Sequence, residues 1–230
     1  MKKLLLILLC VPLIGFGQTT MIPDANFEQR LISFGYDNIL DGTVLTAAID
    51  TVTSLYVSYY GISDLTGIED FTALTILNCG ANDLTSLDVS NNTALIELNC
   101  GLNQLTSLDL SNNTVLTSFW CYNNQLTNLD VRNGNNTNFT YLECEENPML
   151  TCISVDNAAW STTNWIGSGF DFDSQHYFSN NCSGTDIQEH STNKELLKVT
   201  DLLGRETKQT NQPLFYIYDD GTVEKRIVIE

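Results

Sequence analysis

The chain reads LTILNCGANDLTSLDVSNNT over residues 74–93 and LIELNCGLNQLTSLDLSNNT over residues 95–114, so one pattern returns after 21 residues. A third copy starts at Leu116 with the same spacing, a fourth starts at Phe139 after 23 residues, and a weaker copy starts at Val52. A fixed period in the low twenties is typical of a solenoid, in which each turn buries its apolar residues only against its neighbours.

Each copy begins with a strand pattern. Leu77 and Cys79 flank Asn78, which predicts a short strand with one buried face, and strands of successive turns would stack in parallel about 4.8 Å apart. The second half of each turn is too polar and too short for a stable helix, so we expect it to be extended or a single turn. One asparagine per copy follows the strand, where it can satisfy backbone groups of two turns: Asn82, Asn103, Asn124 and Asn147.

The pattern L-x-x-L-x-C-x-x-N-x-L resembles the leucine-rich repeat over residues 52–155. The resemblance implies a solenoid of short parallel strands with a mostly non-helical convex side. We assign residues 52–148 to the repeats, residues 18–51 to an N-terminal helical cap and residues 149–182 to a C-terminal cap. The run around Ile22-Pro23-Asp24 and the run 150–157 resemble the end segments of secreted bacterial proteins of this kind, the internalin-like proteins.

The two caps also follow from physical chemistry, because the first and last turns of a solenoid would otherwise expose their cores. Asp24 can cap a helix that buries Phe27 and Leu31 and ends near Gly35. At the other end, Trp160 and Trp165 can cover the last turn.

Residues 1–17 read as a secretory signal peptide, because Lys2 and Lys3 precede a short apolar run and a small-residue exit at Gly17. The run is too short to span a membrane as a helix. A lipoprotein cysteine at Cys10 is an alternative, although the bulky Leu9 precedes it where that signal requires a small residue. The formal charge of −18 agrees with export. It argues against nucleic acid and anionic membranes as partners, since both would be repelled.

The charge balance changes near residue 194, which supports a linker at 183–195 and a separate segment at 196–230. That segment predicts three antiparallel strands with turns at Gly204 and Asp220-Gly221. Its Asp-Leu-Leu-Gly-Arg-Glu run at 201–206 and its Lys-Arg-Ile-Val-Ile run at 225–229 resemble the C-terminal sorting domain of type IX secretion in Bacteroidota. The resemblance implies an outer-membrane translocon as partner and a secreted or outer-surface location.

The cysteines fall into two groups once Cys10 is set aside. Cys152 and Cys182 flank the C-terminal cap and are the natural disulfide pair in an oxidising compartment. The other four occupy one inward slot on successive turns, slightly too far apart for an unstrained disulfide. We therefore expect a ladder of buried thiols, spread along a line in a way that excludes a zinc site: Cys79, Cys100, Cys121 and Cys144.

Two groups of carboxylates invite a chemical interpretation. Asp88, Asp109 and Asp130 form a column in the polar half of the repeats. We expect them to accept backbone hydrogen bonds from the next turn rather than to hold a cation, because no calcium-loop pattern accompanies them. Asp171, Asp173 and His176 suggest a small hydrolase, but no nucleophile lies at motif spacing. We therefore expect a non-enzymatic protein without a metal or cofactor.

The outward side chains of the strands are the default binding surface of a solenoid. Exposed aromatics beside Asn and Glu suit a protein or glycan ligand, although aromatics also favour strands without any ligand. The expected protein is a monomeric, internalin-like binding or adhesion protein that uses its concave face. The residues predicted to line this face are Tyr56, Tyr59, Asn78, Asn99, Trp120, Tyr122, Tyr141 and Glu143.

Overall fold

The computed structural model describes residues 17–182, 196–200, 213–218 and 223–227. The chain divides into two compact units, one up to Cys182 and one from Ser183 onward. The predicted signal peptide (apart from Gly17), the linker 183–195 and the two predicted tail turns lie outside the described residues.

The N-terminal cap contains a pair of antiparallel strands and two helices. Strand β1 (Thr19–Met21) pairs antiparallel with β2 (Thr43–Leu45), and helix α2 (Thr46–Ile49) follows directly. Helix α1 (Ala25–Phe34) begins at Asp24, whose side chain accepts hydrogen bonds from the N–H groups of Asn26 and Phe27. It ends at Gly35 in the left-handed conformation (φ 82°) that favours glycine. The helix buries Phe27 and Leu31 fully, as the sequence predicts.

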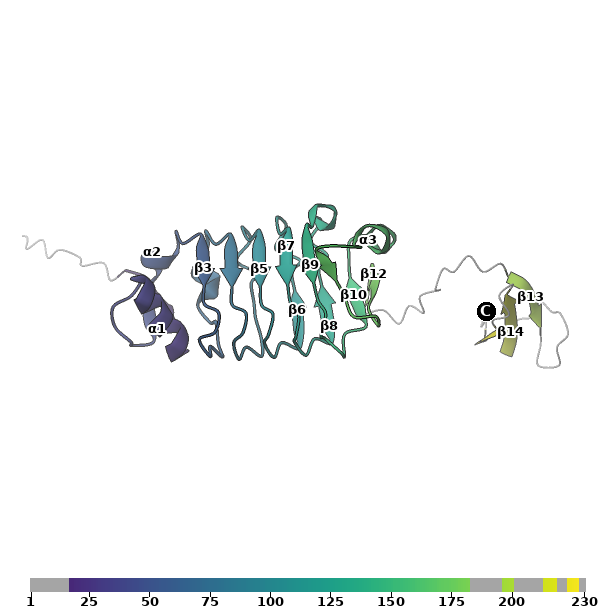
Figure 1. The fold of residues 1–230 in the computed structure, drawn as a ribbon, viewed down its shortest axis with the longest axis horizontal. Helices are drawn as coiled ribbons and strands as arrows, with labels where there is room; N and C mark the ends of the chain where they lie inside the picture. The colour runs from purple at the N-terminus through teal and green to yellow at the C-terminus, as the bar shows by residue number, and fades with distance from the viewer. Residues whose placement is uncertain (1–16, 183–195, 201–212, 219–222, 228–230) are drawn as a thin grey trace, which may run out of the picture. The chain divides into compact units, whose positions relative to one another are not determined.

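A six-stranded parallel sheet runs the length of the repeats (Figure 1). In spatial order it contains β3 (Ser54–Tyr56), β4 (Ile76–Asn78), β5 (Glu97–Asn99), β7 (Ser118–Trp120), β9 (Tyr141–Glu143) and β11 (Phe170–Asp171). In each three-residue strand the central side chain is buried, whereas most of the flanking ones are partly or fully exposed. This alternation fixes which side chains form the inner and outer faces of the sheet.

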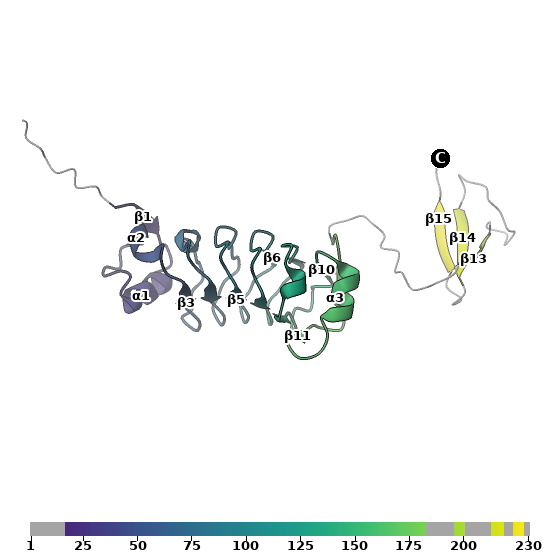
Figure 2. The same cartoon turned by 90° about the horizontal axis from the view of Figure 1, so that it is seen from above.

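The polar half of the repeats forms a second parallel sheet in the later turns (Figure 2). It contains β6 (Ser107–Asp109), β8 (Asn128–Asp130), β10 (Cys152–Ser154) and β12 (Tyr177–Ser179). Elsewhere this side carries the 3₁₀ turns η1 (Ile68–Asp70) and η2 (Asn136–Asn138). This side is therefore extended or forms single turns, as predicted. The pairing of its extended segments into a sheet was not predicted.

The asparagine column joins adjacent turns through the backbone, as the sequence predicts. The Nδ2 of Asn103 donates to the carbonyls of Cys79 and Cys100 at 3.1 and 3.0 Å, and its Oδ1 accepts from the N–H of Leu84 at 3.0 Å. Asn82, Asn124 and Asn147 repeat the arrangement. Because these side chains are nearly fully buried, each replaces water as the partner of backbone groups that the bend leaves unpaired.

A second buried asparagine column lies on the opposite side of the turns. Asn92 donates to the carbonyls of Ile68 and Phe71, and Asn113 donates to those of Val89 and Asn92. This column was not predicted, although the recurring Ser-Asn-Asn-Thr run of the sequence contains it.

The hydrogen-bond donors predicted for the aspartate column are wrong. Asp88 and Asp109 each accept a hydrogen bond from the N–H two residues later in the same turn, at 2.9 and 2.8 Å, rather than from the next turn. Asp130 accepts one in the same way and also pairs with the guanidinium of Arg132 at 2.5 Å. An Asx turn of this kind needs only local geometry, so it forms wherever the chain reverses.

The C-terminal cap closes the solenoid with helix α3 (Ala158–Asn164) and an aromatic cluster. Trp165 is almost fully buried and contacts the rings of Phe139, Phe170 and Phe178 at 5.3 to 6.0 Å between centroids. Strands β11 and β12, which the sequence did not predict, extend the two sheets by one more turn. The cap is therefore an irregular repeat rather than a separate lid.

The second unit is a three-stranded antiparallel sheet in the order β13 (Leu196–Thr200), β14 (Pro213–Tyr218) and β15 (Val223–Ile227). Among the described residues of the whole chain, no helix is long and apolar enough to cross a membrane.

Candidate functional site

The outward residues of the six-stranded sheet form a continuous surface, which we call the strand face. Two columns of side chains run across it in strand register. The first contains Ser54, Ile76, Glu97, Ser118 and Tyr141. The second contains Tyr56, Asn78, Asn99, Trp120, Glu143 and Asp171. The predicted face residues that belong to strands therefore do lie side by side on one surface.

Two aromatic side chains of the strand face stack on each other. The rings of Trp120 and Tyr141 lie 5.7 Å apart between centroids and are inclined by 25°. Tyr141 is 47% exposed, and Trp120 is partly buried. An offset stack on a rigid sheet holds both rings in one orientation, which offers a partner a preformed apolar surface.

Tyr122 follows Trp120 by two residues, and its ring covers Gly101 of the preceding turn. A Cβ atom on Gly101 would come within 2.7 to 2.9 Å of the Tyr122 ring, so the tyrosine can lie flat only because the neighbouring residue is a glycine. Burial, and then Tyr59, Glu143 and Glu145, raise the pKa of Tyr122. Its phenol is therefore protonated at neutral pH and available as a hydrogen-bond donor.

The N-terminal part of the strand face is more polar and more open. Tyr56 and Tyr59 are 52% and 80% exposed, and Tyr59 adopts a positive φ of 66°. Asn78 and Asn99 use their Oδ1 atoms locally, since these accept hydrogen bonds from the N–H groups of Gly80 and Gly101. The Nδ2 groups of the two asparagines make no hydrogen bond to the described residues.

The C-terminal part of the strand face is acidic. Glu143 and Asp171 are register partners on β9 and β11, and Glu145 follows two residues after Glu143. Burial, followed by the charges of Asp171, Glu143 and Glu146, raises the pKa of Glu145. The hydrolase alternative weighed from the sequence included Asp171, and the structure places this residue beside Glu143 on the strand face.

The remaining residues of that hydrolase hypothesis have structural roles. Both carboxylate oxygens of Asp173 accept backbone hydrogen bonds, from Glu146 and Asn147, each at 2.9 Å. The side chain of His176 is 1% exposed, its Nε2 lies 3.7 Å from Asp173, and burial lowers its pKa. A buried histidine beside an occupied carboxylate cannot reach a substrate, so these three residues do not form an acid–base site.

The four repeat cysteines are buried and free, and the structure forms the predicted disulfide between Cys152 and Cys182, with the Cα atoms 5.8 Å apart. Burial raises the pKa of Cys79 to about 12. The sulfurs of Cys121 and Cys144 lie 3.2 Å apart. Since the thiols follow the repeat axis, they serve as small core side chains. In the described part of the chain, no three His, Cys, Asp or Glu residues cluster as a metal site.

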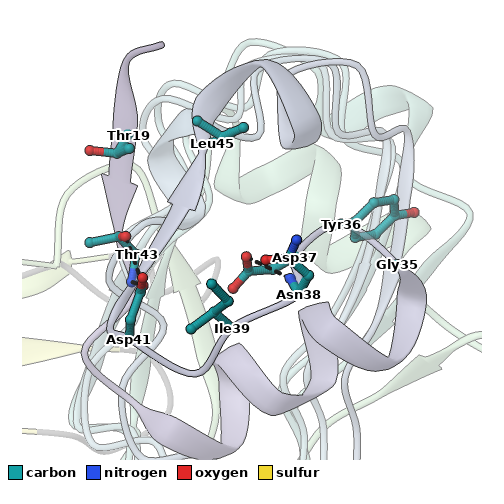
Figure 3. A pocket seen from close by; sticks show the side chains of 9 residues that line it. All are labelled: Thr19, Gly35, Tyr36, Asp37, Asn38, Ile39, Asp41, Thr43 and Leu45. Carbon is teal, nitrogen blue, oxygen red and sulfur yellow. Dashed lines mark hydrogen bonds between the residues drawn. The ribbon is translucent and has the colours of Figure 1, made fainter. Parts of the chain in front are cut away.

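Three hollows in the described residues lie away from the strand face. One of about 360 Å³ opens on the N-terminal cap (Figure 3). Its lining combines apolar and acidic side chains: Thr19, Gly35, Tyr36, Asp37, Asn38, Ile39, Asp41, Thr43 and Leu45. Two more lie in the polar half of the repeats, one beside Asp88 and Asp109 and one beside Asp64 and Glu69. None of these three hollows is lined by a residue of the two side-chain columns of the strand face.

The repeat period, the parallel strands and the asparagine column together define a leucine-rich-repeat solenoid. No protein-family model matches the chain. A 70-residue stretch, 30% of the chain, is 39% identical to Internalin J of Listeria monocytogenes serotype 4b (strain F2365), and the match spans 8% of the length of that protein.

Two solved structures from Listeria monocytogenes are similar. The functional domain of InlJ, which includes a cysteine ladder, aligns with a TM-score of 0.47 and 31% identity over 60% of this chain and 38% of that chain. The internalin InlF of strain 4b F2365 aligns with a TM-score of 0.49 and 22% identity over 59% of this chain and 44% of that chain.

Proposed function

We propose that this chain is an exported binding or adhesion protein of the leucine-rich-repeat type, which recognises a protein or a glycan on its strand face as a monomer. The stacked pair of Trp120 and Tyr141 is the observation that carries the proposal. Aromatic anchors on a rigid scaffold lose little conformational entropy on binding and dominate the energetics of many interfaces. The similarity of the repeats to Internalin J supports a binding role.

The test uses a peptide array and a glycan array, both probed with the full chain. For the probes that the wild type binds, the signal of a Trp120→Ala/Tyr141→Ala double variant should be at least tenfold lower. Tyr177→Ala is the matched control, because Tyr177 is an equally exposed aromatic (50%) that belongs to β12 of the other sheet. Equal signals for the wild type and the double variant would refute the strand face as the binding site.

We further propose that residues 1–17 direct export and that residues 196–230 address the protein to the type IX translocon, so that it reaches the medium or the outer cell surface. The sorting-domain resemblance of the tail and its small antiparallel sheet support this. The Cys152–Cys182 disulfide suits an oxidising compartment.

The address is tested by expressing the chain with and without residues 196–230 in a cell that has type IX secretion, and by measuring the mass and location of the product. The full chain should reach the surface or the medium, and the truncated chain should stay in the periplasm. Identical export of both forms would show that residues 196–230 are not a sorting signal.

A further inference from the structure

The acidic end of the strand face carries charges that have no partner. Among the described residues, no hydrogen-bond donor or base contacts the carboxylates of Glu143 or Asp171, and the Oε2 atom of Glu145 is buried without a hydrogen bond. The adjacent acids differ, since Glu146 accepts from Asn123 at 2.6 Å and Asp173 accepts two backbone N–H groups. Three carboxylates thus gather on the sheet beside the aromatic pair, in the register of β9 and β11, without a basic partner among the described residues.

The described bases of this unit cannot neutralise these charges. Between residues 17 and 182 the basic residues are Arg30 and Arg132. Arg132 pairs with Asp130 through Nε and Nη2 in the other sheet. Arg30 lies in the N-terminal cap, at the opposite end of the repeats. The raised pKa of Glu145 reflects its burial and then this excess of neighbouring negative charge.

The contact of helix α1 with the first turn shows how aromatic rings of this protein hold a cation. The guanidinium carbon of Arg30 lies 4.5 Å from the ring centroid of Tyr60 and 4.0 Å from that of Phe34, and its Nε lies 3.5 Å from the carbonyl oxygen of Tyr56. A cation over an aromatic ring gains about 0.5–2 kcal/mol, depending on its desolvation. At the C-terminal end, the Trp120 and Tyr141 rings offer the same kind of surface with carboxylates beside it.

The register places a ring and a carboxylate next to each other. Trp120 on β7 is the direct parallel partner of Glu143 on β9, and Glu143 is the partner of Asp171 on β11. Neighbouring strands lie about 4.8 Å apart, so one guanidinium or ammonium group can cover the Trp120 ring and bond to the next carboxylate. Arginine suits this geometry especially, because its planar group stacks on a ring and forks onto a carboxylate.

We propose that the surface formed by Trp120, Tyr141, Glu143, Glu145 and Asp171 binds an arginine- or lysine-bearing extended segment of a partner protein. This inference rests on the proposed function of the strand face and specifies its ligand. The cationic side chain stacks on the aromatic pair, and the carboxylates pair with its charge. A neutral glycan could use the rings but would leave the three carboxylates unpaired.

The test is a calorimetric titration of the full chain with a hexa-arginine peptide at 0.15 M salt, with a neutral cellohexaose titration alongside. Because the chain is strongly acidic, the controls must match in charge. Glu143→Gln/Glu145→Gln should weaken hexa-arginine binding at least tenfold. Asp88→Asn/Asp109→Asn removes the same charge from the polar half of the repeats and keeps an oxygen for each Asx turn, so it should change the affinity less than twofold.

Equal weakening by the two double variants, or no binding of hexa-arginine, would overturn the inference. The cellohexaose arm separates this failure from failure of the proposed function. Suppose that hexa-arginine does not bind, that cellohexaose does, and that Trp120→Ala weakens cellohexaose binding whereas Glu143→Gln/Glu145→Gln does not. The strand face then binds a neutral ligand, and only the inference of a cationic partner is wrong.

Discussion

The carboxylate of Asp173 accepts a hydrogen bond from the backbone N–H of Asn147, with 2.9 Å between Oδ2 and N. Two repeats earlier, the equivalent N–H of Asn103 donates to the carbonyl of Asn123 on the next turn. Asp173 thus supplies an acceptor where the regular turns end. Asp24 does the same at the first turn, where its Oδ2 accepts the N–H of Ser63 at 2.8 Å. One carboxylate therefore replaces a missing turn at each end of the solenoid.

This cap predicts a specific dependence of stability on pH. Partial burial raises the pKa of Asp173, but hydrogen bonds from Glu146 and Asn147 outweigh it, and the net pKa lies below the ordinary value of 3.8. A depressed carboxyl pKa stabilises the fold above the ordinary pKa, and that contribution is lost as the pH falls through the lower folded-state value. Asp173→Asn keeps an acceptor for only one of the two backbone N–H groups and should therefore cost about 1 kcal/mol at pH 7. It should also flatten the acid limb of the stability curve.

Urea unfolding between pH 7 and pH 3 measures this effect. Asp83→Asn is the control, because the exposed Asp83 carboxylate accepts no hydrogen bond from the described residues. If the two variants show the same curve, Asp173 is not an end cap.

The second asparagine column predicts that adjacent, identical residues differ in importance. Asn113 is fully buried and donates to two carbonyls of the preceding turn, whereas Asn112 is exposed. Asn113→Ala removes one of the two donors to each carbonyl, which keep the N–H groups of Asn92 and Leu95, and should cost about 1–2 kcal/mol of unfolding free energy. Asn112→Ala should change it by less than about 0.5 kcal/mol. Thermal unfolding of both variants decides the point, and equal losses would rule out the column as a stabilising element.

A column of strained residues precedes the first asparagine column. Leu102 adopts a positive φ of 56°, and Asn123 occupies the equivalent position with a φ of 52°. A branched side chain costs about 1–2 kcal/mol in this region, whereas asparagine tolerates it better. Leu102→Asn should therefore stabilise the fold by about 0.5–1 kcal/mol.

The matched control for Leu102→Asn is Val115→Asn, which replaces an exposed aliphatic residue at ordinary φ. It should not stabilise the fold. A lower denaturation midpoint for Leu102→Asn than for the wild type would contradict the strain argument.

Thiol chemistry distinguishes the two groups of cysteines. Full burial keeps the four ladder thiols inaccessible, and the raised pKa of Cys79 (about 12) also keeps that thiol protonated. Ellman's reagent should therefore label none of the four in the native state and all four in 6 M guanidinium. Reducing the Cys152–Cys182 disulfide should lower stability by about 3–4 kcal/mol, as expected for a closed loop of about 30 residues. Rapid labelling of native protein would show that the ladder is open.

The sequence predicted the solenoid, its strand positions and the first asparagine column, because a 21-residue recurrence places the same side chain in the same environment on every turn. It also predicted the Cys152–Cys182 disulfide, which is confirmed. The roles of residues outside the regular repeats were not predicted. Asp171 and Asp173 lie two positions apart in the cap, yet one extends the strand face and the other bonds to the backbone. Their roles differ because β11 pairs with β9, and no local sequence pattern predicts that pairing.

Alternation along the strands and the repeat register placed Trp120 and Tyr141 outward on adjacent turns. The stacking of their rings was not predicted, because it depends on side-chain geometry across β7 and β9. The orientation of Tyr122 over Gly101 likewise depends on the space that a glycine leaves on a neighbouring strand.

Hydrogen exchange of the full chain, with and without a probe selected on the arrays, shows directly where the probe binds. We expect slower exchange on β7 and β9, within residues 118–122 and 141–145, when the probe is bound. Residues 177–179 of β12 in the other sheet should exchange at an unchanged rate. Protection limited to the second sheet or to the N-terminal hollow, with β7 and β9 unaffected, would contradict the account and place the binding site elsewhere on the solenoid.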